Sequence, residues 1–457
     1  MTQDGHARES GTTSLISGLR VMSYNILADC LAWEHLRTLY NSQPQSVLRW
    51  ERRCHLIAQE IAHHQPDILC LQEVDHFGFF ERELGRLGYQ GRYLRRTGNR
   101  SDGLAMFWRK SAFASVHMEE LRFAELGLKD NVAQVATFEL RRSCARAIVG
   151  GGGVPASGQA PEIDASAHAS LLRPLTPRVV VGNVHVLFNP RRGDVKLAQV
   201  RALLRALGAA AARCTPTAPC VACGDFNAVQ GSAIYRFIAS GRLALAGVDR
   251  RRASGQVEGL GWGWERMRAA LLGGHPIAGP RPAARGRQTW TPAELAMLQG
   301  RPGSVGDGEA EQAADEADRG EQASAQFAEG SSLRLPLTGV AARDPAGDGG
   351  FDTSPGSTSA PRDPVLRHPL RLRSGYAAVT GREPLWTTCH DAYMGTVDFV
   401  WYGGPRRGRS GRPGFMLEAK GALLPPDPDA LSTGLPNERH ASDHIPLVVD
   451  FELRAVV

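Results

Sequence analysis

The sequence has no apolar stretch approaching the roughly 18 residues of a membrane-spanning helix, and no N-terminal segment with the pattern of a signal peptide. Its 8 cysteines are ordinary for 457 residues, and their spacing forms no disulfide framework. These absences argue against a membrane protein, a membrane partner and a disulfide-stapled scaffold. We therefore expect a soluble chain of a reducing compartment, located in the cytoplasm, with the nucleus as a further location.

The formal charge of +6 conceals an asymmetry along the chain. Residues 307–321 contain seven acidic side chains and one arginine, so this segment carries −6 and the rest of the chain +12. A basic remainder suits a polyanionic partner such as a nucleic acid. A GC-rich genome that favours arginine would give the same bias, so charge alone does not identify the substrate.

Glycine and proline are concentrated in segments without hydrophobic periodicity, among 51 Gly and 28 Pro in all. We expect residues 1–18 to form a flexible tail and residues 19–455 to form one domain, interrupted by insertions at 141–176 and 249–375. Structureless loops of this length do not belong inside a compact core, so both insertions are expected at the surface. The second, partly acidic insertion is a candidate docking segment for a protein partner.

The remaining sequence predicts an α/β protein in which strands predominate. Short apolar runs indicate strands, and apolar residues at intervals of three or four indicate helices between them. Asp194 is expected to cap a helix that runs to about Ala212, and Ser232 to cap a shorter one. We predict two packed, mainly antiparallel sheets flanked by helices, with polar side chains gathered where strands end.

Six short motifs end apolar runs with side chains that suit a metal ion or a phosphate. Each is weak alone, but all six in this order are not plausibly accidental. They are Ser23-Tyr24-Asn25, Leu71-Gln72-Glu73, Asn183-Val184-His185, Gly224-Asp225-Phe226-Asn227, Thr396-Val397-Asp398 and Ser442-Asp443-His444.

Two of these motifs offer oxygen ligands for a hard cation. Mg²⁺ keeps several waters and needs only one or two carboxylates, so Glu73 is the best candidate for its principal ligand. Asn25 ends the first strand, where its amide could orient a carboxylate or a metal-bound oxygen, and Asp443 could help to bind the metal. Taken alone, Glu73 reads as a surface residue and Asn25 as a turn residue.

The remaining motifs offer proton-transfer and phosphate-binding groups. Asp225 can hold the attacking water, and the Asn227 amide can donate a hydrogen bond to the charge that develops on phosphate oxygens. If the strand continues through these residues, both side chains point to one face of the sheet. Asp398 and His444 are predicted to pair, which would fix the imidazole tautomer and stabilise its cation. His185 is a candidate donor to the scissile phosphate or the leaving oxygen.

Other polar residues are weaker candidates for substrate binding. Arg191 and Arg192 are natural phosphate ligands, although surface arginine pairs are common. Asp102 could supply a polar contact at the cleft, or simply form a turn before the next strand. Cys220 and Cys223 invite a zinc interpretation, but no second pair of ligands follows, so we expect both to be buried strand residues.

Together the six motifs resemble the endonuclease/exonuclease/phosphatase superfamily, to which DNase I belongs, over nearly all of residues 19–248 and 376–455. Within it, the run from Ser23 to Asp29 resembles the branch of the catabolite-repression deadenylases, Nocturnin and Angel. The phrases 188–199 (FNPRRGDVKLAQ) and 435–438 (LPNE) look most like Angel.

The resemblance implies an enzyme that uses Mg²⁺, with Mn²⁺ as an alternative ion, on RNA 3′ ends. It implies metal roles for Asn25 and Glu73, and a base-binding position formed by Pro190 and Tyr393. A 3′–5′ exoribonuclease of the poly(A) deadenylase type is the first expectation. An RNA 2′,3′-cyclic phosphatase of the Angel type is the alternative, and a catalytically silent RNA or translation-factor binder is the second alternative.

Overall fold

The computed structural model describes residues 17–141, 176–256, 288–299, 364–405, 414–426 and 434–456. Apart from Pro364, these residues belong to one compact unit, which comprises Met1–Gly303 and Val365–Val457. The second unit, Ser304–Pro364, otherwise lies outside the described residues, as do nearly all of the expected tail and of the first expected insertion.

Two six-stranded sheets form the frame of the described residues. The first sheet has the order β15 (Gly414–Ala422), β16 (Leu447–Val456), β1 (Ser17–Asn25), β2 (Ile68–Val74), β4 (Gly103–Arg109), β3 (Tyr89–Arg95). The second has the order β11 (Leu370–Ser374), β14 (Asp398–Pro405), β8 (Cys220–Asp225), β7 (Arg178–His185), β6 (Val132–Leu140), β5 (Phe113–Arg122). Each sheet has one parallel pair, β1 with β2 and β7 with β8, and its other pairs are antiparallel.

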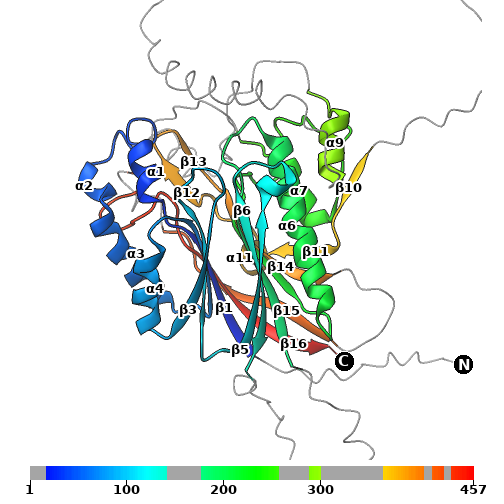
Figure 1. Ribbon diagram of the computed structural model, residues 1–457, viewed down its shortest axis with the longest axis horizontal. Coiled ribbons are helices and arrows are strands. Elements are labelled where there is room, and N and C mark those ends of the chain that lie inside the picture. The colour runs from blue at the N-terminus through cyan, green and yellow to red at the C-terminus, as the bar shows by residue number, and fades with distance from the viewer. Residues whose placement is uncertain are drawn as a thin grey trace, which may run out of the picture. The chain divides into compact units, whose positions relative to one another are not determined.

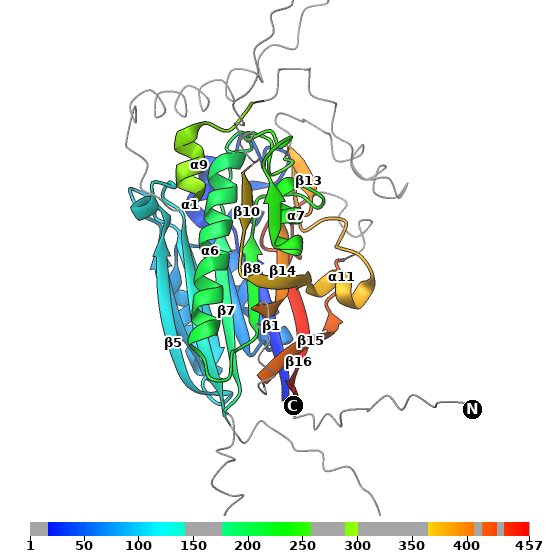
Figure 2. The ribbon, with the colours of Figure 1, turned by 90° about the vertical axis from the view of Figure 1, so that its right-hand side faces the viewer.

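Helices cover the outer faces of both sheets (Figure 1). Those packed on the first sheet are α3 (Trp50–His64) and α4 (Phe77–Arg86), and those packed on the second are α6 (Gly193–Arg213) and α7 (Ala233–Ser240). The helix α9 (Pro292–Gln299) packs against α6. Figure 2 shows α6 lying along the second sheet, over β7 and β8. The shorter elements are α1 (Asp29–Glu34), α2 (Gln45–Leu48), η1 (Phe123–Leu126), α11 (Gly375–Thr380), and the two-stranded ribbons β9 (Arg242–Ala244) with β10 (Val365–Arg367) and β12 (Thr388–His390) with β13 (Tyr393–Gly395). None of the helices in the described part of the chain is long and apolar enough to span a membrane.

The central strands are buried on both faces because successive side chains enter different cores. On β7, Val179 and Val181 pack between the two sheets, whereas Val180 and Val184 pack beneath α6. β8 alternates in the same way. Strands covered on both sides read as continuous apolar runs. The predicted α/β sandwich of two mainly antiparallel sheets flanked by helices is confirmed.

The range 249–375 is not uniformly irregular, in contrast to its expected role as an insertion. β11 pairs with β14 at the edge of the second sheet, β10 pairs with β9, and α9 packs against the core beneath α6. The alternation of Leu370, Leu372 and Ser374 with exposed arginines marks the strand in the sequence. Residues 257–287 and 300–363 of this range lie outside the described residues.

The two expected helix caps differ in outcome. Ser232 accepts a hydrogen bond from the Tyr235 amide at 3.1 Å, so it caps α7. Asp194 does not cap α6, because the helix begins at Gly193 with Arg192 as its N-cap residue. The Asp194 carboxylate instead lies in the first turn, where it pairs with Arg192 at 3.1 Å.

Candidate active site

Strand ends bring the predicted polar residues together at one edge of the sandwich. Asn25 ends β1, His185 ends β7 and Asp225 ends β8. Asp398 begins β14, and the antiparallel register places it directly opposite Asp225. The two sheets meet here, because the Asn25 amide of the first sheet donates to Asp225 of the second at 3.3 Å. The edge therefore joins side chains from both halves of the fold.

Glu73 is held by donors from the last residue of β1 and from the segment that follows it. Its Oε1 accepts a hydrogen bond from Asn25 Nδ2 at 2.9 Å, and its Oε2 accepts one from the Ala28 amide at 3.1 Å. Burial and then the charge of Asp443 raise the pKa of this carboxyl to about 7, against the lowering effect of Asn25. Glu73 adopts a left-handed backbone, φ 56°, at the bulge where β2 leaves its register with β4. Such strain in a non-glycine residue is typical of functional sites.

Asp225 lies at the centre of the group. Its Oδ2 is 3.5 Å from His185 Nε2 and 3.9 Å from His444 Nε2, in addition to its contact with Asn25. Burial and then the charge of Asp398 raise the pKa of Asp225 to about 8, although the His444 cation acts in the opposite direction. A carboxylate with a raised pKa is a stronger base, which suits a group that accepts a proton from water.

His444 and Asp398 form the expected pair. His444 Nδ1 lies 2.8 Å from Asp398 Oδ2, and both side chains are almost wholly buried. Because a carboxylate only accepts, this bond places a proton on Nδ1 and directs Nε2 toward Asp225. Burial lowers the pKa of His444, but the charges of Asp398 and Asp443 outweigh it, so the net pKa lies well above the usual value.

His185 has the opposite electrostatic environment. Burial, then the positive charges of Arg96 and His444, hold its pKa well below the usual value, so the ring is neutral at pH 7. Its Nε2 is 3.9 Å from Glu73 Oε1, and its buried Nδ1 has no hydrogen-bond partner. A neutral ring can donate a hydrogen bond to phosphate, whereas the cationic His444 is better suited to donate a proton.

Asn227 is at the site, but not in the geometry that the sequence suggested. The strand ends at Asp225, and Asn227 adopts a left-handed backbone with φ 46°. Its amide N–H donates to Asp225 Oδ1 at 2.9 Å, and its side-chain Nδ2 donates to the Val186 carbonyl at 2.9 Å. One of its two side-chain donors is thereby used, and its backbone helps to fix Asp225.

The carboxylates fit a hard divalent cation. Glu73 and Asp443 are close enough for the charge of Asp443 to raise the Glu73 pKa, and Asp443 accepts from the Tyr40 hydroxyl at 2.9 Å. Asn25 fits less well as a ligand, because its Oδ1 accepts from the Leu27 amide while its Nδ2 faces Glu73. The amide therefore orients the carboxylates. Among the described residues, one group of potential metal ligands has atoms within 4.8 Å of one another, and it comprises Asp225, Asp398 and His444.

Glu73 and Asp443 are better candidates for binding a hard cation than that group. The His444–Asp398 contact is a hydrogen bond between two of its members, so Nδ1 carries a proton and cannot bind a metal. The raised pKa of His444 keeps a proton on Nε2 as well at neutral pH. Cys220 and Cys223 are not part of the group, and both are buried strand residues, as expected.

The weaker substrate-binding candidates do not form one cluster in the structure. Asp102 is buried and lies 3.5 Å from Arg96, so it belongs to an ion pair beside the site. Arg192 is paired with Asp194. Arg191 and Pro190 lie in the loop between β7 and α6, where the Arg191 amide binds Asn189 Oδ1 at 2.9 Å. This loop follows His185, so it lies next to the site in the chain.

Tyr393 lies beside the carboxylates. The nearby charges of Asp225 and Asp398, after the larger effect of burial, raise the pKa of its hydroxyl. Its ring covers Gly395, because a Cβ built there would lie 2.3 Å from the Tyr393 hydroxyl oxygen. The side chain is half-buried, so part of it remains available for contact with a ligand.

Several residues that support the site were not among the site residues predicted from the sequence. Tyr40 binds Asp443 from a loop near α2, and the buried Arg53 of α3 donates to the carbonyls of Ile26 and Leu27. Lys196 of α6 donates to the Asn227 carbonyl at 3.0 Å. A long charged residue within an otherwise apolar helix face is the one sequence signal that could have marked Arg53 and Lys196.

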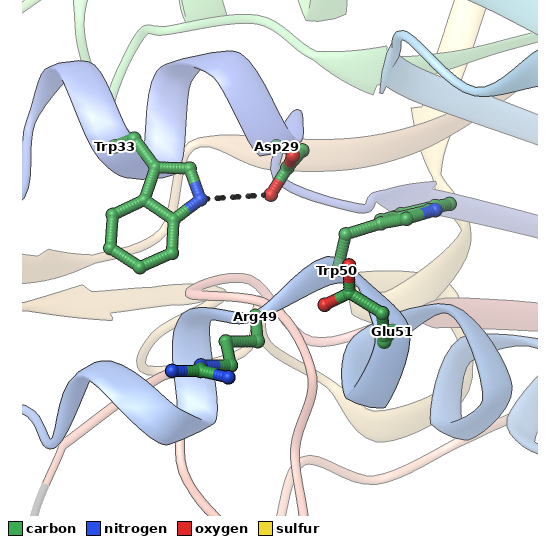
Figure 3. A pocket seen from close by; sticks show the side chains of 5 residues that line it. All are labelled: Asp29, Trp33, Arg49, Trp50 and Glu51. Atoms are coloured by element: carbon green, nitrogen blue, oxygen red, sulfur yellow. Dashed lines mark hydrogen bonds between the residues drawn. The ribbon is translucent and has the colours of Figure 1, made fainter.

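A surface pocket of about 270 Å³ lies beside α1 and the start of α3 (Figure 3). It is lined by Asp29, Trp33, Arg49, Trp50 and Glu51, and the Trp33 indole donates to Asp29 at 3.2 Å. None of the side chains that converge on Asp225 lines it, so it is separate from the candidate active site.

The chain belongs to the Endonuclease/Exonuclease/phosphatase family, whose model matches residues 22–444. Carbon catabolite repressor protein 4 homolog 6 of Arabidopsis thaliana is 43% identical over 238 residues, which are 52% of this chain and 29% of that protein. Protein angel homolog 2 of Homo sapiens is 30% identical over 452 residues, which are 95% of this chain and 69% of that protein. The fold also resembles the crystal structure of ANGEL2, a 2′,3′-cyclic phosphatase, in complex with adenosine-2′,3′-vanadate, with a TM-score of 0.62, 27% identity and 96% coverage of each chain.

Proposed function

We propose that this chain is a magnesium-dependent phosphodiesterase that hydrolyses phosphodiester bonds at the 3′ ends of RNA. The observation that carries the proposal is the convergence of Glu73, Asp225 and the His444–Asp398 pair at one edge of the sandwich. The site thus joins a carboxylate suited to a hard cation, a basic carboxylate and a buried imidazolium. These are the groups that an attack of water on phosphorus requires.

Each side chain has a role that follows from its environment. Asp225 accepts a proton from the attacking water, because its pKa of about 8 makes it the more basic carboxylate. His444 presents its protonated Nε2 to a phosphoryl or leaving oxygen, while Asp398 holds the ring in place. His185 and Asn227 donate hydrogen bonds to the phosphoryl oxygens. A divalent cation at Glu73 and Asp443 would polarise the phosphoryl group as a Lewis acid.

Two reactions at an RNA 3′ end fit this set of groups. In the first, water attacks the last internucleotide phosphorus, the bond to the preceding 3′-oxygen breaks, and that oxygen takes up a proton. A nucleoside 5′-monophosphate leaves, as in a 3′–5′ exoribonuclease of the poly(A) deadenylase type. The 43% identity to a carbon catabolite repressor protein 4 homolog supports this branch of the family.

In the second reaction, water attacks a terminal 2′,3′-cyclic phosphate. One ring P–O bond breaks, and the released ribose oxygen takes up a proton. A second water then breaks the remaining P–O bond, so inorganic phosphate leaves and an RNA of unchanged length ends in two hydroxyl groups. The resemblance to ANGEL2, a 2′,3′-cyclic phosphatase, favours this candidate. That structure holds an adenosine-2′,3′-vanadate, and Tyr393 with Pro190 would contact a terminal adenine here.

Three 5′-labelled RNAs of one body sequence test the proposal, ending in an A-tail, in mixed sequence or in a 2′,3′-cyclic phosphate. Each is incubated with Mg²⁺, with Mn²⁺, with EDTA, and with the variants Glu73→Ala and Glu83→Gln. Glu83 lies on the outer helix α4 in an ion pair with Arg86, so its variant should keep wild-type activity.

A ladder on the A-tailed RNA supports the exoribonuclease, and a changed end at constant length supports the phosphatase. Either activity should vanish in EDTA and in Glu73→Ala. If none of the RNAs changes with either metal, the proposal is wrong, and the alternative of a silent RNA or translation-factor binder takes its place.

A further inference from the structure

Lys196 is a fully buried cation that lies beneath the active-site edge. It sits in the first turns of α6, where its ammonium donates to the Phe188 carbonyl at 3.1 Å and to the Asn227 carbonyl at 3.0 Å. Its third hydrogen bond goes to Gln256 Oε1. An ammonium has three donors, so all are used. Burial lowers the pKa of Lys196 to about 7, and the charge of Asp225 only partly offsets this effect. Because burying an unpaired polar group is costly, the three acceptors are needed to hold the side chain in place.

Gln256 contacts both Lys196 and Asn227, so the three residues are joined by hydrogen bonds to one another. Its Nε2 donates to Asn227 Oδ1 at 3.2 Å, while its Oε1 accepts from Lys196. Asn227 is therefore held at its backbone carbonyl by Lys196 and at its side-chain oxygen by Gln256. The two residues approach from different segments, one from α6 and the other from the chain that follows Asp249.

The held residue is one whose conformation is strained. Asn227 has φ 46°, in the left-handed region that a non-glycine residue enters only when its surroundings enforce it. This conformation points its amide N–H at Asp225 Oδ1, at 2.9 Å. If Asn227 relaxed toward an extended backbone, the Asp225 carboxylate would lose that donor and the freedom of its oxygens would increase.

We propose that Lys196 and Gln256 are positioning residues that hold Asn227 in its left-handed conformation and, through its amide, fix the Asp225 carboxylate for catalysis. Lys196 is not expected to touch the substrate, because it is wholly buried and its donors are all engaged. Gln256 acts through its contacts with Lys196 and Asn227. The expected effect on kcat rests on the proposed function, whereas the expected effect on the conformation of Asn227 does not.

A double-mutant cycle between Lys196→Met and Asn227→Ala tests the proposal. Lys196→Met should lower kcat about 10- to 100-fold with a change in KM of less than about 3-fold, because misplacing one catalytic group affects the chemical step more than binding. On the Asn227→Ala background, the same substitution should lower kcat by less than about 3-fold. Alanine loses the side-chain contacts with Val186 and Gln256 and disfavours a left-handed backbone, so the amide contact with Asp225 is already lost there. Equal losses on both backgrounds would show general damage to the fold and would overturn the proposal.

Two further variants keep the test decisive if Lys196→Met does not fold. Gln256→Met removes both contacts of Gln256, and Gln256→Glu keeps an acceptor for Lys196 but loses the donor to Asn227. We expect Gln256→Met to lower kcat more than Gln256→Glu, and both losses to be absent on the Asn227→Ala background. Lys420→Met is the matched control, because Lys420 is a half-exposed residue of β15 with ion pairs at the surface. Unchanged kcat in both Gln256 variants would contradict the proposal.

A measurement without substrate separates this inference from the proposed function. Hydrogen exchange at the Asn227 amide reports its bond to Asp225 directly. Exchange should be at least about 10-fold faster in Lys196→Met and in Gln256→Met than in wild type and Lys420→Met. If wild type cleaves no RNA but this pattern is seen, the proposed function is wrong and the positioning network stands. Equal exchange in all proteins would overturn the network itself.

Discussion

His444 Nδ1 lies 2.8 Å from Asp398 Oδ2, and the two residues come from segments that belong to different sheets or lead into them. Asp398 begins β14 in the second sheet, and His444 lies just before β16 in the first. Their contact therefore forms only when the sandwich is complete. The pair directs the other imidazole nitrogen toward Asp225, so the geometry of the fold determines which nitrogen faces the reacting groups.

Asp398→Asn should lower kcat on the order of 10²-fold or more, because the amide neither stabilises the His444 cation nor enforces its tautomer. In wild type, the charges of Asp398, Asp443 and Asp225 keep the His444 pKa well above its usual value despite burial. The cation is therefore retained as pH rises through 7. Without Asp398 the His444 pKa falls, so the alkaline limb of kcat against pH should move to lower pH.

The control for this prediction is Asp450→Asn, the same change at a 43% exposed carboxylate of β16 that pairs with Arg20. It should leave both kcat and the pH profile unchanged. A profile for Asp398→Asn that keeps its alkaline limb in place would show that His444 does not act as a cation.

Affinity for a divalent cation should increase with pH through the neutral range. In the metal-free protein the pKa values of Glu73 and Asp225 are raised to about 7 and about 8, so protons occupy these carboxylates as pH falls below those values. Since the ionised form binds the metal, the dissociation constant should be about 10-fold lower at pH 8 than at pH 6. Titration calorimetry with Mg²⁺ and Mn²⁺ measures this directly.

Glu73→Gln should abolish that binding, whereas Glu83→Gln should bind as wild type does. Mg²⁺ should also raise Tm in wild type, since a ligand at 100 times its dissociation constant stabilises a fold by about 2.7 kcal/mol. An affinity that is independent of pH, or equal in Glu73→Gln, would place the metal elsewhere.

The convergence of side chains was predictable where the residue ends a strand. Asn25, His185 and Asp225 follow apolar runs, and the ends of neighbouring parallel strands meet at one edge of a sheet. The contact of Asp398 with His444 followed from the resemblance and from their chemistry. These residues could be identified because each carries a local signal in the sequence.

The groups behind them could not be predicted, because their contacts span long separations in the chain. Tyr40 reaches Asp443 across 403 residues, and Gln256 lies near the start of the range 249–375, which composition marked as irregular. The left-handed backbone at Asn227 is also invisible to a rule that continues the strand. Such features result from tertiary packing, which overrides local preference.

Arg53 should contribute to stability and to the alignment of two site loops. Its side chain is wholly buried and donates to the carbonyls of Ile26 at 2.9 Å, Leu27 at 2.8 Å and Ala441 at 3.3 Å. Ile26 follows Asn25, and Ala441 precedes the Ser-Asp-His motif. Arg53→Met leaves these acceptors buried without partners, so we expect a loss of roughly 3 kcal/mol in the free energy of unfolding.

Urea unfolding followed by tryptophan fluorescence measures this loss, with an unchanged m value as the sign of two-state behaviour. Arg53→Lys keeps the charge but cannot reach the same set of carbonyls, so its loss should be smaller. Arg86→Met, which alters an exposed residue of α4, serves as the control. A loss below about 0.5 kcal/mol for Arg53→Met, the range of ordinary surface substitutions, would contradict this role.

Tyr393 should contribute to binding of the terminal base if its ring stacks on that base beside Asp225. Stacking on an aromatic side chain is worth about 1–3 kcal/mol per base, so Tyr393→Ala should raise KM about 10-fold or more for RNA that ends in adenosine. Tyr393→Phe retains the ring and should keep the wild-type KM. An RNA with an abasic 3′-terminal nucleotide separates stacking from damage to the site, because it has no base to stack. On that RNA, wild type and Tyr393→Ala should have the same KM. If Tyr393→Ala instead raises KM as much on the abasic RNA as on the adenosine-ended RNA, the ring supports the carboxylates by packing over Gly395 and does not stack on the base.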